Sequence, residues 1–452
     1  MSCLWFETAL LPAGWAQGVR LTIEAGAIAA IETGTAPRVG DARGAIATPG
    51  LGNVHSHGFQ RGMAGLTEYR GSGEDDFWSW RALMYRFLDR LTPDDVQAIT
   101  AKAYAEMLEG GFTRVGEFHY LHHDPAGQPY ATLSEMAWRI AAAAEMTGIG
   151  LTLLPVYYAQ GGFGGAPPAS GQRRFLNDPE RFARLLEESG RAVAGLPDAR
   201  LGVAPHSLRA VTPADLKAVV PLAGPGGVHI HAAEQVKEVD DCLAWSGQRP
   251  VEWLLNEVGL DRRWRLIHAT HLTESETRRL AQSGAVAGLC PITEANLGDG
   301  IFPAEAYLAA GGSMAIGTDS NVLIDPVQEL RTLEYGQRLS RRARNVLAAP
   351  ERPSTGATLF ARALAGGAQA LGESTTGLAI GASADIVSLD GDHPALVGKS
   401  GDTLLDGWIF AGERRCVETV WRRGERVVEH GRHRNAETIG AAYAATIRKL
   451  LA

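Results

Sequence analysis

Between residues 49 and 375 the hydrophobic positions of the chain fall into two alternating patterns. Short apolar runs typical of buried strands are each followed by a longer segment rich in Ala, Leu and Glu, which is typical of a helix. Repetition of this unit predicts an α/β fold with a parallel sheet. Eight such strands, the number that closes a (β/α)8 TIM barrel, are predicted to end at Asn53-Val54, Thr113–Phe118, Leu151–Leu154, Leu201–Ala204, Val228–Ile230, Leu266-Ile267, Ala285–Leu289 and Met314–Ile316.

An open, doubly wound parallel sheet is the alternative arrangement for the same alternation of elements. That fold is often signalled by a GxGxxG turn between an early strand and the helix that follows it. No such turn follows an early strand here, and the barrel is therefore the preferred prediction.

The two ends of the chain have a different texture, with short alternating strands separated by turns. Val19–Ile23 alternates, a turn follows, and the same pattern returns at 384–389, 417–421 and 426–428. We therefore expect residues 1–48 and 376–434 to form one small β-sandwich domain built from both termini. Residues 49–375 form the barrel in this scheme, and residues 435–452 form a C-terminal helix.

Composition narrows the class of partner. The 452 residues are 45% hydrophobic and 21% charged, with a formal net charge of -8, as in ordinary globular proteins. An acidic chain is a poor match for nucleic acid or an anionic membrane, which attract clustered Lys and Arg. The four cysteines are far apart, and neither a signal peptide nor a long apolar run is visible. These features predict a cytoplasmic protein.

Candidate metal ligands stand at the predicted strand ends. His55 and His57 are two residues apart, so that on a strand both imidazoles face the same side. Such a pair alone is a weak signal that a surface turn would also explain. However, His231, His268 and Asp319 end later strands, and the ends of barrel strands meet on one rim.

Three histidines and one carboxylate suit Zn²⁺ or another borderline divalent ion, and they leave a position for water. His229 shares a face with His231 and is the alternative ligand; His231 is preferred because it is nearer the end of the strand. Binuclear barrel hydrolases commonly bridge their two ions with a modified lysine at the end of the fourth strand. The nearest lysine here, Lys217, falls in the next helical segment, which favours a single ion.

Three further residues are candidates for handling protons or anions. Glu234 follows His231 by three residues, which places a carboxylate beside the ion without making it a ligand and suits it to carry protons. A solvated glutamate at a helix N-terminus is its ordinary alternative. Arg81 and Arg209 could grip carboxylates with their planar guanidinium groups, whereas by spacing alone either is as easily a surface ion-pair partner.

Several stretches of the chain resemble those of a known family. They are His55-Ser-His-Gly-Phe-Gln-Arg-Gly-Met-Ala-Gly65, Glu117–Pro125, Gly171–Phe175, Pro205–Val211, His229–Gln235, His268–His271, Leu289–Gly300 and Gly317–Asn321. The chain resembles the amidohydrolase superfamily and, within it, the formimidoylglutamate deiminases of bacterial histidine degradation. The resemblance covers nearly the whole chain. Its departures are slight: Gly58 stands where alanine is expected and Thr318 where serine is usual, and neither removes a functional group.

The resemblance implies a TIM barrel of the amidohydrolase type that hydrolyses N-formimino-L-glutamate to N-formyl-L-glutamate and ammonia, by attack of a metal-bound hydroxide on the formimino carbon. It implies one Zn²⁺, with Fe²⁺ as the alternative, on His55, His57, His231 and Asp319. It also implies a homodimer. By the same resemblance, Gln60, Arg81, Tyr120, His206 and Arg209 hold the dicarboxylate substrate, while Glu234, His268 and Asp319 carry protons.

Three rival functions use the same ligands. A deaminase of a flat heterocycle such as guanine or cytosine is expected to line its pocket with aromatic and amide groups rather than with two arginines. A hydrolase that expels chloride from a triazine-like ring is the second. The third is a metal-binding barrel without activity, which the presence of Glu234 and His268 beside the ligands disfavours.

Overall fold

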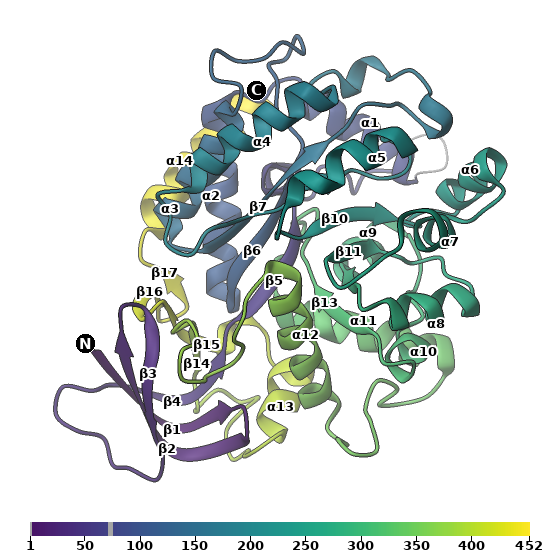
Figure 1. Cartoon of the computed structure of the whole chain (residues 1–452). Coiled ribbons are helices and arrows are strands. Elements are labelled where there is room, and N and C mark those ends of the chain that lie inside the picture. The colour runs from purple at the N-terminus through teal and green to yellow at the C-terminus, as the bar shows by residue number, and fades with distance from the viewer. Residues whose placement is uncertain (1, 71–75) are drawn as a thin grey trace.

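The structure is a computed structural model that describes residues 2–70 and 76–452. Its centre is a ring of parallel strands, and helices surround this ring (Figure 1). The barrel strands are β5 Leu51–Ser56, β6 Phe112–His119, β7 Gly150–Tyr157, β8 Arg200–Leu201, β9 Ala204–Pro205, β10 Val228–Ala232, β11 Trp264–His268, β12 Val286–Leu289 and β13 Ser313–Ile316. All of the eight expected strand positions are occupied. The expected fourth strand consists of two short pieces, β8 and β9, that both pair with β7.

Two parallel sheets join to close the barrel. One contains β5 to β8 with β9, and the other contains β10 to β13. Isolated bridges connect Val203 to Val228 and Ser207 to His231 on one side, and Ser56 to Asp319 on the other. The last of these bridges places the end of the first barrel strand directly beside the end of the last. The (β/α)8 barrel is therefore confirmed, and the open-sheet alternative is wrong.

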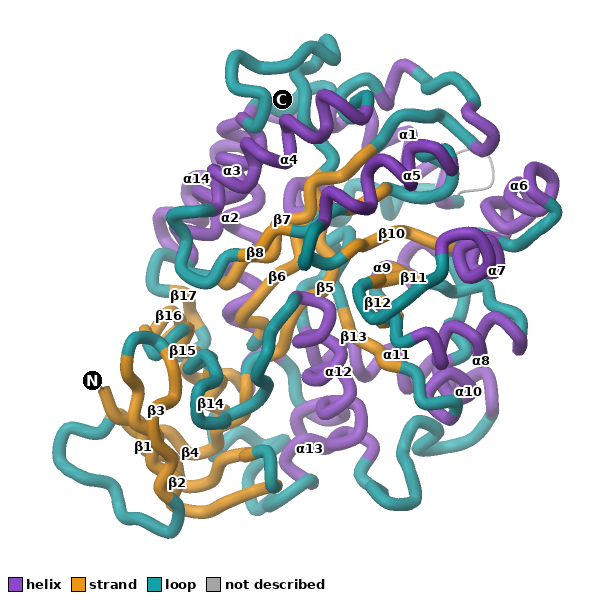
Figure 2. The backbone as a smooth tube through the Cα atoms, viewed as in Figure 1, coloured by secondary structure: helices purple, strands orange, loops and turns teal. Residues whose placement is uncertain are grey.

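Helices follow the strands around the barrel (Figure 2). They are α1 Phe77–Leu88, α2 Pro93–Gly110, α3 Glu135–Thr147, α4 Pro179–Val193, α5 Pro213–Val219, α6 Val236–Ser246, α7 Pro250–Trp253, α8 Glu274–Ser283, α9 Pro291–Leu297, α10 Ala304–Ala309, α11 Pro326–Arg341, α12 Thr355–Leu371, α13 Thr403–Ala411 and α14 Ala436–Leu451. Local sequence explains their limits. Helix α2 begins with a capping box between Thr92 and Asp95 and with Pro93 in its first turn, and it ends at Gly111 with φ 101°.

Six shorter segments of 3₁₀ or π type complete the helical structure of the described residues: η1 Gly58–Met63, η2 Phe163–Gly165, η3 Ser170–Gln172, η4 Val220–Ala223, η5 Leu254–Val258 and η6 Arg414–Cys416. The segment η1 follows the first barrel strand immediately. It therefore starts at the rim where the candidate ligands lie.

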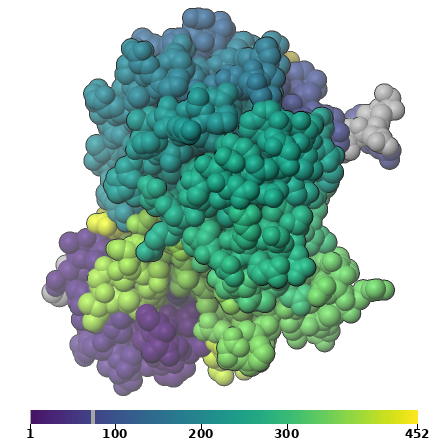
Figure 3. All heavy atoms as spheres, turned by 45° about the vertical axis from the view of Figure 1, so that its right-hand side comes forward, coloured from purple at the N-terminus to yellow at the C-terminus, as the bar shows by residue number. Residues whose placement is uncertain are grey.

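Both ends of the chain contribute to one further sheet of eight strands. Its order is β17-β16-β15-β14-β4-β1-β2-β3. The strands are β1 Ser2–Leu11, β2 Gly14–Glu24, β3 Ala27–Glu32, β4 Ala42–Pro49, β14 Ile386–Leu389, β15 Val417–Arg422, β16 Glu425–Glu429 and β17 Arg432–His433. In Figure 3 the purple N-terminal atoms lie beside the yellow-green atoms of the C-terminal part.

This sheet is strongly curled around its own apolar residues. The rings of Phe6 on β1 and Trp421 on β15 meet edge to face with their centroids 5.7 Å apart. Two strands separate β1 from β15, so a flat sheet would hold their backbones about 14 Å apart. Curling brings the two rings together in a separate small core that also includes Leu4, Leu21 and Ile386.

Two expectations from composition concern absent features. All four cysteines are free. Among the residues that the structure describes, no helix is long and apolar enough to span a membrane.

Candidate functional site

The four expected ligands converge at the rim of the barrel. His55 and Asp319 approach to 3.4 Å (Nε2 to Oδ1), and His57 and the same Asp319 oxygen approach to 3.2 Å. His231 Nε2 lies 3.0 Å from His55 Nε2. The ligand atoms of these four buried residues all lie within 4.8 Å of one another, a group that could hold a metal ion.

The orientations of the imidazole rings of His57 and His231 suit the binding of a cation. His57 Nδ1 lies 2.8 Å from the carbonyl oxygen of Phe118, and His231 Nδ1 lies 3.1 Å from that of His206. Each Nδ1 must therefore carry its proton, which leaves Nε2 with a free lone pair directed into the cluster. The Nε2 atom of His231 lies 3.0 Å from Nε2 of His55, and the Asp319 carboxylate lies beside both His55 and His57. The donor set therefore fits a single divalent ion.

Backbone strain occurs at two of the functional candidates. His268 has φ 68° and Asp319 has φ 43°, in the left-handed region that non-glycine residues avoid at a cost of about 1–3 kcal/mol each. The turn that carries Asp319 is held by a buried network in which Asn53 Nδ2 donates to Thr318 Oγ1 at 2.7 Å. In addition, Asn321 Nδ2 donates to the carbonyl oxygen of His57 at 3.1 Å. The first and last barrel strands thus fix each other's candidate ligands.

Burial and charge shift the acidities in this cluster. Burial lowers the pKa of His55 to about 3, so this ring is neutral, as a metal ligand must be. The pKa of Asp319 lies well below its usual value, because its contacts with His55 and His57 outweigh the burial of its charge. Both groups are thus in the protonation state that binds a metal.

His268 has the opposite character. Burial opposes its charge, but the nearby carboxylates of Glu234, Glu294 and Asp319 raise the pKa of His268 to about 10. Its Nε2 lies 3.6 Å from Glu234 and 3.9 Å from Asp319, while its Nδ1 lies 3.3 Å from Glu294. This imidazole can hold a proton beside the ligand cluster.

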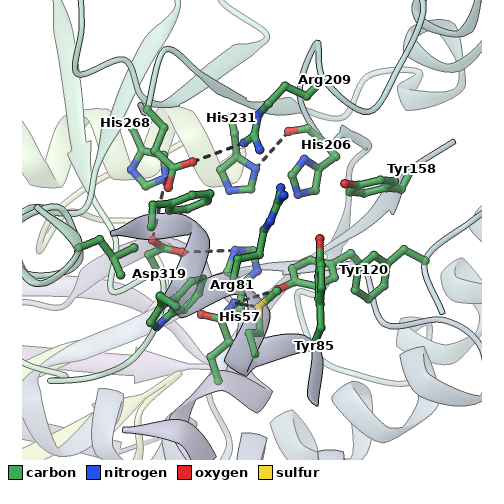
Figure 4. A pocket seen from close by; sticks show the side chains of 17 residues that line it. His57, Arg81, Tyr85, Tyr120, Tyr158, His206, Arg209, His231, His268 and Asp319 are labelled. Carbon is green, nitrogen blue, oxygen red and sulfur yellow. Dashed lines mark hydrogen bonds and ion pairs between the residues drawn. The ribbon is translucent and has the colours of Figure 1, made fainter. Parts of the chain in front are cut away.

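A pocket that opens to the surface reaches the cluster. Its wall contains each of the five residues expected to hold substrate: Gln60 of η1, Arg81 of α1, Tyr120 after β6, His206 after β9, and Arg209 (Figure 4). Glu234, His268, His57, His231 and Asp319 line it as well. Residues separated by more than two hundred positions in sequence are therefore brought into one cavity.

Charged and polar side chains on the pocket wall are positioned by their neighbours. Arg209 lies 3.5 Å from Glu234 and 3.6 Å from Glu238. Burial opposes the charge of Arg209, but these two carboxylates raise its pKa. Gln60 Nε2 donates to the hydroxyl of Tyr120 at 2.8 Å, and its Oε1 is buried without a hydrogen-bond partner among the described residues. The site thus has guanidinium groups and an unsatisfied amide available to a polar ligand.

Sequence reasoning did not identify several residues of this site. Phe77, Trp80, Met84, Tyr85, Tyr158, Phe175 and Leu297 line the pocket. Of these, Tyr158 could have been found, because it directly follows the third barrel strand. Glu294 on α9 and Asp299 after it were also missed, although both lie in the stretch Leu289–Gly300 on which the family resemblance partly rests.

Two family models together match almost the whole chain. The first, described as "Amidohydrolase family", matches residues 46–427. The second, described as "Formimidoylglutamate deiminase HutF, N-terminal domain", matches residues 1–45.

Among characterised proteins, the chain is 50% identical to a formimidoylglutamate deiminase of Pseudomonas aeruginosa, with 100% of both chains covered. It is 32% identical to a 5-methylthioadenosine/S-adenosylhomocysteine deaminase of Natronomonas pharaonis, which covers 90% of this chain and 87% of that protein. Among solved structures, an amidohydrolase from Brucella melitensis matches with a TM-score of 0.97, 57% identity and complete coverage of both chains. An adenosine deaminase from Xanthomonas campestris with bound zinc matches with a TM-score of 0.81 and 25% identity, over 99% of this chain and 97% of that one.

Proposed function

We propose, from the premise that this chain belongs to the amidohydrolase family and within it to the formimidoylglutamate deiminases, that it hydrolyses N-formimino-L-glutamate to N-formyl-L-glutamate and ammonia in histidine degradation. One observation carries the proposal. A single pocket contains two arginines suited to carboxylates and also a proton-carrying Glu234–His268 pair beside a metal-binding cluster. A substrate with two carboxylates and a hydrolysable C–N bond fits both the arginines and the proton-carrying pair.

The proposed cofactor is one Zn²⁺ ion, with Fe²⁺ as the alternative, held by His55, His57, His231 and Asp319. Support comes from the three imidazole nitrogens and one carboxylate that converge there, a donor set that suits zinc. When bound, such an ion lowers the pKa of coordinated water towards ~7 and so supplies a nucleophile at neutral pH.

The substrate's glutamate part is proposed to lie against Arg81, Arg209, Gln60, Tyr120 and His206. Arginine binds carboxylate through two parallel hydrogen bonds, which fix orientation as well as position. Burial keeps His206 neutral by holding its pKa well below the usual value, so its ring can accept or donate a single hydrogen bond. These contacts would direct the formimino group towards Asp319 and Glu234.

Proton transfer is proposed to involve three residues of the chain. Asp319 or His268 is proposed to accept a proton from the attacking water, and the pKa of about 10 of His268, which keeps this ring protonated at neutral pH, favours Asp319. The positive charge on His268 then stabilises the tetrahedral intermediate. Burial raises the pKa of Glu234, which favours a proton on its carboxyl group, and this carboxyl is proposed to deliver a proton to the departing nitrogen. The balanced reaction converts an amidinium and water into an amide and ammonium.

A direct assay tests this function. Purified, metal-loaded protein incubated with N-formimino-L-glutamate is expected to release ammonia and N-formyl-L-glutamate in equal amounts. Guanine and cytosine, tested in parallel, are expected to remain unchanged. Deamination of either base without action on N-formimino-L-glutamate would refute the proposal.

The organisation of the chain is also a proposal. Residues 1–48 and 376–434 would form one domain and residues 49–375 another, followed by the helix 435–452. The first of these domains is supported by the eight-stranded sheet, which contains strands from both ends of the chain. The proposal of a homodimer rests on the family resemblance. Size-exclusion chromatography with light scattering would measure the mass of the assembly and so test it. A cytoplasmic location is supported by the four free cysteines.

A further inference from the structure

Two tyrosines on the pocket wall, Tyr85 and Tyr158, have no role in the function proposed above. Tyr85 lies in α1, Tyr158 directly follows β7, and both line the pocket. Figure 4 shows both hydroxyl groups directed into the space beside His206 and Arg81. Tyr158 is 5% exposed, and its ring centroid lies 4.6 Å from that of His206. The two side chains therefore bring hydroxyl groups into the cavity.

The side-chain amide of Gln172 fixes the direction of the Tyr158 hydroxyl group. Gln172 Oε1 accepts a hydrogen bond from the backbone amide of Ala169 at 2.7 Å, so the other end of this side chain must be its NH₂ group. That NH₂ group donates to the Tyr158 hydroxyl oxygen at 2.6 Å, and Gln172 is itself buried. Because the hydroxyl oxygen accepts this bond, its proton must point away from Gln172.

Tyr85 is a second neighbour of the same hydroxyl group. Burial raises the pKa of Tyr85, and a hydrogen bond to Tyr158 raises it further, as expected when the Tyr85 hydroxyl is the donor. The Tyr158 oxygen then accepts from both Gln172 and Tyr85, which occupies its two lone pairs. The O–H of Tyr158 remains, and among the described residues nothing accepts a hydrogen bond from it. It is free to donate to a ligand in the pocket.

The segment Gly171–Phe175 holds both tyrosine rings in place. A Cβ at Gly171 would lie only 2.4 Å from the Tyr85 ring, so glycine is needed for the backbone to approach this ring so closely. The Phe175 ring packs against both tyrosines, with its centroid 6.1 Å from that of Tyr85 and 5.6 Å from that of Tyr158. This stretch is one of those on which the family resemblance rests, and here it positions two hydroxyl groups.

The charges near these hydroxyl groups favour an anion. The positive charges of Arg81 and Arg209 oppose the rise in the pKa of Tyr85, which means that both guanidinium groups lie near its hydroxyl. Arg81 also lies over the Tyr85 ring, 5.7 Å from its centroid. Among the described residues of the pocket wall, the acids are Glu234 and Asp319, which belong to the proposed proton carriers and ligands. A free O–H beside two cations suits a carboxylate, which only accepts hydrogen bonds.

We propose that the Tyr158 hydroxyl, directed by Gln172 and Tyr85, donates a hydrogen bond to one of the two substrate carboxylates and so contributes to the selection of a dicarboxylate; this inference rests on the proposed function. A carboxylate can accept from the phenol and from a guanidinium group at the same time. A neutral heterocycle at this place could accept from Tyr158 but would leave the buried guanidinium without a counter-charge, at a cost in binding. Tyr158 is thus a specificity-determining residue, and Gln172 is a positioning residue.

The substitution Tyr158→Phe removes the hydroxyl group and keeps the ring. With metal-loaded enzyme, the KM for N-formimino-L-glutamate and the inhibition constant of N-formyl-L-glutamate are expected to rise about tenfold or more, as for the loss of a hydrogen bond to a charged group. The value of kcat should stay within about threefold, because the contact holds the bound substrate and the transition state alike.

The preceding residue offers a matched control. Tyr157 is also buried, but its hydroxyl donates to Asp215 at 2.9 Å, and Tyr157 does not belong to the pocket wall. Tyr157→Phe removes the same atom from the same strand end and should leave KM unchanged.

Two inhibitors with one carboxylate each separate a direct contact from a general loss of shape. N-formyl-4-aminobutyrate lacks the α-carboxylate of N-formyl-L-glutamate, and N-formyl-2-aminobutyrate lacks the γ-carboxylate. The effect of Tyr158→Phe should disappear for the inhibitor that lacks the contacted carboxylate and persist for the other. Equal effects on all three inhibition constants would overturn the inference.

The positioning role of Gln172 has its own test. Gln172→Met removes the amide at similar volume and should raise KM by less than Tyr158→Phe does. In the Tyr158→Phe background it should add nothing, because it acts through that hydroxyl; a further rise would overturn the positioning role. If wild type turns over N-formimino-L-glutamate and Tyr158→Phe leaves KM unchanged, the inference is wrong and the proposed function stands. A wild type without turnover would instead refute the proposed function.

Discussion

The substitution Arg209→Met tests whether the pocket recognises a carboxylate. The Arg209 side chain is only 11% exposed and lies 3.5 Å from Glu234 and 3.6 Å from Glu238. Methionine retains much of the apolar stem and removes the guanidinium group. Glu238 keeps the backbone amides of Ala233 and Glu234 as donors, so the variant is expected to fold and to retain its metal.

The expected loss follows from the bonds that Arg209 would make with substrate. A two-pronged contact with a carboxylate contains two charged hydrogen bonds, each worth about 1.5–3 kcal/mol. Their combined loss of at least about 3 kcal/mol corresponds to a fall in kcat/KM of about a hundredfold or more. Part of the fall should appear in kcat, because Glu234 loses the cation that helps to hold it.

Three measurements decide the outcome: kcat and KM for N-formimino-L-glutamate, zinc content per chain, and the melting temperature. Arg263→Met is the matched control, since Arg263 forms an exposed ion pair with Asp261 that contributes little. An unchanged kcat/KM in Arg209→Met, with metal and melting temperature intact, would refute the carboxylate-binding role.

Three further predictions concern the metal and the buried histidines. Asp319→Ala should abolish turnover and lower the bound metal, and activity near wild type would mean that the ligand on the eighth barrel strand is wrong. Removing the ion with a chelator should abolish activity and lower the melting temperature, and adding Zn²⁺ should restore both; an active metal-free protein would contradict the proposed chemistry. Burial lowers the pKa of His119 to about 3. Between pH 6.5 and pH 3 the unfolded chain therefore binds a proton at this residue, whereas the folded chain does not. The free energy of unfolding consequently falls as the pH falls from 6.5 towards 3. At pH 5 this single group costs about 2 kcal/mol; the difference in unfolding free energy between pH 7.5 and pH 5 should therefore be smaller in His119→Phe, and an equal difference would contradict the assignment.

Much of the candidate metal cluster was predictable because its residues obey a local rule. His55 and His57 share one face of a strand, and parallel barrel strands place all their carboxyl ends on the same rim. Asp319 and His231 follow from the same argument, since each stands at the end of an apolar run. Periodicity along the chain was therefore sufficient to bring these residues together.

The pairing of the carboxyl groups could not be predicted in this way. Glu294 and Asp299 follow a strand by several residues, at positions where helices and loops commonly carry solvated acids. Only the fold shows that Glu294 lies 3.3 Å from His268 and that Asp299 lies beside Glu234, because these contacts join the ends of different strands across the rim. The same holds for the curled sheet, in which Phe6 meets Trp421 from the other end of the chain.

The amino-acid sequence by itself determined the barrel, the position of the candidate ligands and the family to which the chain belongs, because each of these depends on regular spacing or on local motifs. The tertiary structure alone decided which acids surround His268, which rings are neutral and where a buried oxygen is left without a partner. These properties depend on distances and burial between distant segments, and no pattern along the chain encodes such distances directly.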